Sequence, residues 1–323
     1  MGTPLVAKTE AVGGPAPRSA DVRHLACRHR RARDAGLALV AVLWMLAALT
    51  VTTTGVIYAV RGEVQSVAMF REIAVAGALG EAGVVLAARD LVGSHDRDTG
   101  LKRFEVVFEQ MAVAVRIVPL TGLIDLNAAP EPLLTDLIAT VGEVERGRAA
   151  SLAQRIIDWR DADDQPRPEG AENVAYAAAG LPFRTRGGPF ESPEDLLQVL
   201  GVDFDLYTKV RPLVTVHGRG GGRVDPGAAP MAVLRVLTSG NEQIAVEYAN
   251  ARDAMGNLAD TTRFPAAYIA RGQSPRFLIE ASVQLSNGAY LVNRRIIDVS
   301  SGQDGIPWRT MWAERLVEPA ATS

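Results

Sequence analysis

The stretch AGLALVAVLWMLAALTVTTTGVIYAV, residues 35–60, decides the architecture of this chain. No charged residue lies between Asp34 and Arg61, and a helix needs only about 20 apolar residues to cross the hydrocarbon of a bilayer. We therefore predict a transmembrane helix over residues 37–60. A basic cluster precedes this helix and none follows it, so its leading end is expected in the cytoplasm and the rest outside. The cluster comprises Arg23, Arg28, Arg30, Arg31 and Arg33.

The border between the basic and the apolar part carries Gly36 followed by Leu37. A cleavable secretory signal would have an apolar core of only about 7–15 residues, which is shorter than this run. The arrangement resembles the signal of type IV prepilins, whose peptidase cuts after the glycine and leaves the apolar helix on the mature protein. The resemblance implies a prepilin peptidase that cuts between Gly36 and Leu37, with methylation of the new N-terminus. A plain anchor helix is the alternative.

Charge is distributed unevenly along the 323 residues, which carry a net charge of −3. Seven of the 34 basic residues but only three acidic ones precede Leu37, which leaves about −7 on the remainder. An acidic body disfavours nucleic acid as a partner. The single cysteine, Cys27, precedes the apolar stretch, so an intrachain disulfide is excluded. Neither a Gly-x-Ser-x-Gly nor a His-Glu-x-x-His motif occurs, and we predict no enzymatic activity.

The helical pattern continues beyond the membrane segment. Apolar residues recur at spacings of three and four as far as Leu91, which predicts one helix from Leu37 to about Leu91. Glycine weakens a helix by about 1 kcal/mol relative to alanine, so bending or local melting is expected at several positions. These are Gly55, Gly62, Gly77, Gly80 and Gly83.

Two pairs of β-rich runs predict hairpins. Residues 104–108 and 112–118 form the first, and residues 276–285 and 289–298 form the second, with an Asn-Gly turn between its strands. A long N-terminal helix followed by an antiparallel sheet is typical of pilins. We therefore predict an α+β fold in which the sheet begins before a helical region and is completed after it.

The helical region contains an internal repeat. Residues 122–134 match residues 222–234 at Gly, Asp, Ala, Ala, Pro and Leu. In each copy a turn led by Asp precedes a Pro that opens an apolar helix, and a second helix follows. The predicted organisation is a leader (1–36), a transmembrane helix (37–60), a pilin-like helix with the first strands (61–120), an inserted α-helical domain (121–255) and a C-terminal β part (256–323).

With these features the chain resembles protein K of type II secretion systems, a family of large minor pseudopilins. The resemblance implies a pilin-like body with an inserted helical domain, anchored in the inner membrane by a single pass with its body in the periplasm. It also implies a place at the tip of a short pseudopilus, where the protein contacts the minor pseudopilins I and J. The resembling residues are Gly36 to Trp44, Ile124 to Pro130, Ile157 to Asp164, Pro166 to Pro168, Ala171 and Glu172, Pro189 to Leu197, and Tyr207 to Val216.

The fifth residue after the predicted cut also favours a place at the tip of the pseudopilus. It is Ala41, where major pilins carry a Glu that faces the N-terminal amine of a neighbour. A carboxylate in hydrocarbon is costly unless it is paired, by about 2.5 kcal/mol or more. A subunit without this carboxylate suits the end of a fibre, where no subunit lies above it. We predict one copy per pseudopilus, which initiates assembly.

A dense acidic stretch is the candidate metal site. The spacing fails the EF-hand pattern, because glycine is absent at the sixth loop position. Carboxylates this close repel one another unless a cation joins them, and two prolines stiffen the turn. Helped by the resemblance, we predict calcium there, whereas a solvated charged loop is the alternative. The candidate ligands are Asp158, Asp161, Asp163, Asp164, Glu169 and Glu172.

The best competing function is a membrane-tethered DNA receptor, because the repeated units resemble helix-hairpin-helix modules. Such modules offer backbone N–H groups and flanking cations to phosphate. The first hairpin instead carries Glu143 and Glu145. We therefore predict that nucleic acid is not a partner.

Overall fold

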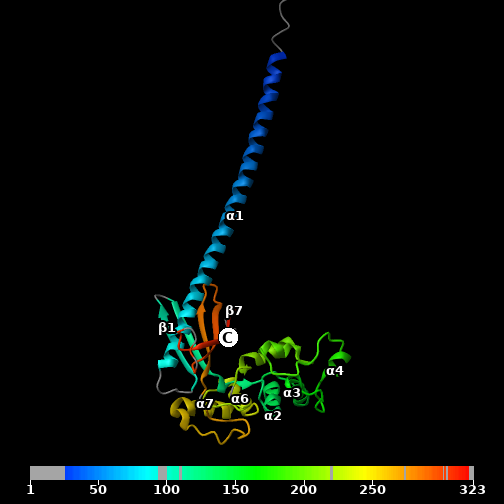
Figure 1. Ribbon diagram of the computed structural model, residues 1–323. Helices are drawn as coiled ribbons and strands as arrows, with labels where there is room; N and C mark the ends of the chain where they lie inside the picture. The colour runs from blue at the N-terminus through cyan, green and yellow to red at the C-terminus, as the bar shows by residue number, and fades with distance from the viewer. Residues whose placement is uncertain are drawn as a thin grey trace, which may run out of the picture. The chain divides into compact units, whose positions relative to one another are not determined.

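The computed structural model describes residues 26–93, 100–108, 111–218, 221–272, 274–300, 302 and 305–319. It divides into two compact units, residues 1–69 and 70–323. The described part of the first unit is the leading part of helix α1 (Ala26–Gly93) (Figure 1). From Leu37 onward, α1 contains a window of mean hydropathy 2.1 with exposed side chains, and it is the one described helix long and apolar enough to cross a membrane. The predicted helix from Leu37 to about Leu91 is confirmed. Residues 1–25 of the predicted leader lie outside the described residues.

The second unit contains a five-stranded antiparallel sheet with the order β1-β2-β5-β6-β7. Strand β2 pairs with β5 from Val113 opposite Val283 to Pro119 opposite Phe277. Strands that flank the helical region are therefore neighbours, and both predicted hairpins are confirmed. The last strand, β7, was not predicted as a separate strand. The strands are β1 (Lys102–Phe108), β2 (Met111–Pro119), β5 (Arg276–Gln284), β6 (Tyr290–Asp298) and β7 (Arg309–Glu318).

The second half of α1 packs on this sheet through glycines. A Cβ atom at Gly83 would lie 2.9 Å from a methyl carbon of Val113, and one at Gly80 would lie 1.8 Å from Asn293 Nδ2. Because α1 stays helical through all its glycines, the local melting predicted at these positions is wrong. At Gly80 and Gly83 the absence of a side chain instead lets the helix approach the sheet closely. Ile117, Ile279 and other buried residues complete the core between helix and sheet.

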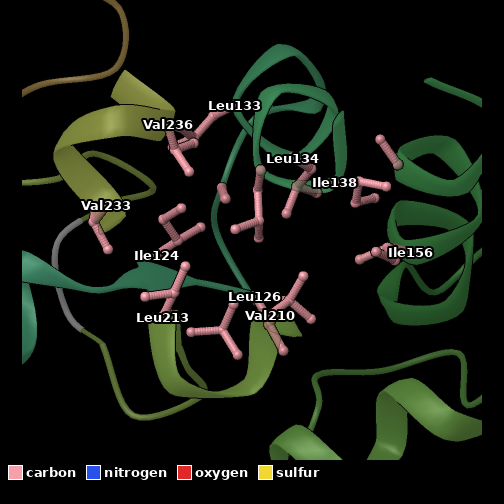
Figure 2. Close-up of a cluster of buried hydrophobic side chains, with 14 of the residues drawn as sticks. Ile124, Leu126, Leu133, Leu134, Ile138, Ile156, Val210, Leu213, Val233 and Val236 are labelled. Carbon is pink, nitrogen blue, oxygen red and sulfur yellow. The ribbon is translucent and has the colours of Figure 1, made fainter. Parts of the chain in front are cut away.

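The helical domain lies between β2 and β5 in the sequence and has its own core. In Figure 2, Leu133, Leu134 and Ile138 of α2 face side chains of α3 and α6. Short 3-10 helices at Pro193–Gln198 and Arg211–Leu213 connect the elements. The elements are β3 (Ile124–Asp125), α2 (Glu131–Thr140), α3 (Arg146–Arg160), α4 (Asn173–Ala178), α5 (Phe204–Val210), β4 (Val214–Thr215), α6 (Met231–Leu237) and α7 (Glu242–Met255).

The segment after α7 belongs to the helical domain. Ala259 and Phe264 are buried in the helical core, and the Phe264 ring meets the ring of Tyr248 edge-on at 4.8 Å between centroids. Ile269 forms a parallel bridge with Val224. The structure therefore places the end of this domain just before β5, rather than at residue 255 as predicted.

Candidate functional site

The sequence repeat is also a structural repeat, because each copy packs on the other. A Cβ atom at Gly122 would lie 2.2 Å from the carbonyl oxygen of Ala228, and one at Gly222 would lie 2.1 Å from that of Ala128. Equivalent glycines therefore sit against equivalent turns of the opposite copy. Both positions require glycine, because any larger residue would overlap the backbone of the facing copy.

The other repeated residues hold their own turns. Asp125 Oδ1 accepts a hydrogen bond from the Asn127 amide at 3.0 Å, and Asp225 Oδ1 accepts one from the Gly227 amide at 2.9 Å. Burial raises the pKa of both carboxyl groups. The second helices also match, since Arg160 donates to the Ala129 carbonyl at 2.8 Å and Arg252 to the Ala229 carbonyl at 2.7 Å. Each of these side chains therefore bonds a backbone group of its own copy and stabilises the domain.

The first hairpin does not offer free amides to a phosphate. The carboxylate of Glu145 accepts hydrogen bonds from the amides of Gly147 and Arg148 at 2.9 and 3.0 Å. These are the N–H groups that a helix N-terminus would present to an anion. Glu143, in the same turn, pairs with Lys209 at 3.0 Å. The geometry therefore disfavours the DNA-binding alternative.

The acidic stretch forms a loop after α3 that folds around Asp158. This side chain is fully buried, and its Oδ2 accepts hydrogen bonds from the amides of Ala171 at 2.9 Å and Arg167 at 3.2 Å. The Arg167 guanidinium Nε lies 3.3 Å from Asp158 Oδ1. A Cβ atom at Gly170 would lie 1.8 Å from Asp158 Oδ2, so glycine is needed there to close the loop.

Three carboxylates of the loop keep buried oxygens that lack a hydrogen bond. These atoms are Asp158 Oδ1, Asp161 Oδ1 and Glu172 Oε1. Burial, followed by the negative charges of Asp158, Asp161 and Asp164, raises the pKa of Glu172 to about 7. Burial and neighbouring acids also raise the pKa of Asp161. Carboxylate oxygens are the hard donors that Ca²⁺ prefers, and of these three atoms only Asp158 Oδ1 already faces a cation, the Arg167 guanidinium.

The structure brings the six predicted ligands together only in part. Asp163 and Asp164 are exposed and bond within the loop, to the Gln165 amide and the Asn173 side chain respectively. Glu169 is also exposed, and its amide donates to Gln154 Oε1. Within the described ranges, no three carboxylate, histidine or cysteine side chains are already arranged as a metal shell. The donor chemistry fits calcium, but the carboxylates would have to close around it.

Sequence reasoning missed Thr185 at this site. Its hydroxyl lies 3.0 Å from Glu172 Oε2 and 3.1 Å from Asn173 Oδ1. Thr185 follows α4 on a separate loop, and a threonine in a loop carries no local signal of such a contact. Only the tertiary fold brings it to the acidic loop.

A second missed residue joins the helical domain to the sheet. Arg211 Nη2 lies 2.9 Å from both carboxylate oxygens of Glu314 on β7, and its Nε donates to Glu194 at 3.1 Å. The guanidinium also lies over the Trp312 ring, 5.8 Å from the centroid. These contacts fix the inserted domain on the outer strand of the sheet.

The predicted processing site lies within α1. Leu37 is exposed, as are the side chains that follow it along the apolar stretch, and Gly36 is part of the same helix. Cleavage after Gly36 stays a prediction.

Comparisons with known proteins point to secretion. Residues 122–219 match the family described as Type II secretion system (T2SS), protein K. The chain is 36% identical over 85 residues to the type II secretion system protein K of Pectobacterium carotovorum subsp. carotovorum, and 33% identical over 85 residues to that of Klebsiella pneumoniae. Each alignment covers 26% of this chain and 26% of the relative, so the chain spans about a quarter of the length of these relatives.

A solved structure shares the fold. It is the crystal structure of the GspK-GspI-GspJ complex from the enterotoxigenic Escherichia coli Type 2 Secretion System, with a TM-score of 0.53 and 18% sequence identity. The match covers 79% of this chain and 99% of the solved chain. The α+β fold is thereby confirmed, and the resemblance to protein K is confirmed over residues 122–219.

Proposed function

We propose, from the match of residues 122–219 to protein K of type II secretion systems, that the whole chain is a minor pseudopilin. It acts at the tip of the pseudopilus and initiates its assembly for protein export across the outer membrane. The observation that carries the proposal is that this matched domain is inserted between neighbouring strands of a sheet packed on a long N-terminal helix. The role is one of assembly and requires no catalysis.

The proposed topology places the protein in the inner membrane. The apolar half of α1 spans the bilayer once, the basic leader lies in the cytoplasm, and the second unit lies in the periplasm. A prepilin peptidase cuts between Gly36 and Leu37. Mass spectrometry of the N-terminus of the mature protein tests this, with Leu37 as the expected first residue. An intact leader, or a cut beyond Thr50, would refute it.

The proposed partners are the minor pseudopilins I and J, which accompany the structural neighbour in its complex. Ala41 leaves no carboxylate for a subunit above, and the inserted domain enlarges the body beyond what close stacking along a fibre allows. Quantitative mass spectrometry of purified fibres should find about one copy per fibre. Abundance comparable to the major pseudopilin, or labelling along the fibre, would contradict a tip position.

We also propose that the acidic loop binds calcium. Asp158, Asp161 and Glu172 would hold the ion, because their buried oxygens lack hydrogen bonds, and the ion would neutralise their mutual repulsion. Calorimetric titration of the chelator-treated chain with Ca²⁺ should show saturable uptake and a higher melting temperature. An absence of both effects would overturn the proposal.

A further inference from the structure

Beside α1, at the β7 edge of the sheet, lies a hollow of about 260 Å³. It is lined by residues of α1, β6 and β7, including Glu81, Asn293, Arg295 and Arg315. Glu81 and Arg295 form a two-point ion pair at 2.7 and 2.8 Å, so their charges are matched within the protein. Arg315 is different, because no carboxylate among the described residues lies within ion-pair distance of it.

Arg315 is nevertheless held in a fixed position. Its Nε donates a hydrogen bond to Asn293 Oδ1 at 2.7 Å. Its guanidinium lies against α1, where a Cβ atom at Gly77 would come within 3.0 Å of Nη1. Glycine at this position therefore makes room for the guanidinium. The protein alone holds the cation in position, without a bound partner.

Asn293 contacts both α1 and Arg315. It is 95% buried, and its Nδ2 makes no hydrogen bond. The Nδ2 atom points at α1 beside Gly80, while Oδ1 faces the Arg315 donor. A buried amide that leaves its own N–H₂ unsatisfied carries a cost. The two Nη groups are left without a protein acceptor among the described residues.

From this arrangement we propose that Arg315 receives a carboxylate side chain of a neighbouring pseudopilin. The choice of a pseudopilin as the partner rests on the proposed function. Charge complementarity selects the occupant, because a planar guanidinium with free N–H groups matches an Asp or Glu carboxylate.

The binding test uses the full-length chain in detergent and a complex of the I and J pseudopilins. Arg315→Glu should weaken binding by about tenfold or more, as expected for loss of a charge-assisted pair and its replacement by repulsion. Arg309→Glu is the matched control, since Arg309 is exposed on the same strand, and it should change binding less than twofold. Equal effects of the two substitutions, with unchanged melting temperatures, would overturn the proposal.

A second measurement separates this site from the proposed function. Arginine side-chain NMR of the wild-type chain, titrated with sodium acetate, should show a saturable shift of the Arg315 Nε–H signal and only a linear drift for Arg309. Absence of saturation would refute the carboxylate site whether or not I and J bind. Saturation without I and J binding would retain the site and refute the choice of partner.

Discussion

Replacing Glu172 by Gln should stabilise the calcium-free protein and remove most of the stabilisation that calcium gives the wild type. Glu172 is 3% exposed, and its pKa rises from 4.5 to about 7 because of burial and nearby acids. The folded state therefore holds a proton between these pH values that the unfolded state has lost. The contribution of Glu172 to stability is therefore greatest below pH 4.5 and is lost as the pH rises through 7.

The cost of ionising Glu172 at pH 8 follows from that shift. At about 1.4 kcal/mol per pKa unit, the upper limit is about 3.5 kcal/mol, and solvent screening at the edge of the loop reduces it to about 1–3 kcal/mol. In chelator, Glu172→Gln should therefore stabilise the protein by this amount at pH 8 and flatten its pH dependence between 4.5 and 7. In calcium at a hundredfold excess over Kd, the wild type should gain about 2.7 kcal/mol, and the variant much less.

Urea unfolding of the full chain in detergent, followed by tryptophan fluorescence, measures both conditions. Glu169→Gln, in the same loop but exposed, is the control and should change neither. If Glu172→Gln destabilises the chelator-treated protein, the reasoning about repulsion in the loop is refuted. If the variant gains as much from calcium as the wild type, Glu172 is not a ligand.

Three further substitutions test the packing. Gly80→Ala should destabilise the second unit by about 1–3 kcal/mol in urea unfolding, because the new methyl group would overlap Asn293; Gly93→Ala, with open space around it, should not. Leu134→Ala should cost about 2.7–5 kcal/mol, seen as a lower urea midpoint, and a loss below 1 kcal/mol would contradict its place in the core. Glu145→Ala should lower the melting temperature by removing the cap of α3, and an unchanged melting temperature would contradict this role.

Local chemistry made much of this fold predictable. The Asn-Gly turn fixed the second hairpin, and the repeated Gly and Pro positions marked the two helix pairs, because each signal acts within a few residues. Strand β7 was missed because its sequence, RTMWAERLVE, does not alternate strictly between apolar and polar residues, and none of its side chains is buried. The segment that carries Phe264 has no periodic pattern, so only its tertiary contacts assign it to the helical core.

The functional contacts were predictable only where one segment carried them. The acidic loop stood out because its carboxylates are close in sequence. Thr185 and Arg211 did not, because each acts on a partner from another element. The glycines of α1 were interpreted by their intrinsic helix propensity, but packing against the sheet decides their role, and that information lies on strands far along the chain.

The pairing of β2 with β5 has a consequence for the order of folding. Pro119 and Phe277 are opposite each other, although the entire helical domain separates them in sequence. Closing so long a loop in an unfolded chain is entropically costly, and pairing of distant strands is slow. If the helical domain folds first, it brings the two strands together and removes most of that search. The domain then acts as a template for the sheet, and pulse-labelled hydrogen exchange should show amides of α2 and α3 protected before those of β5.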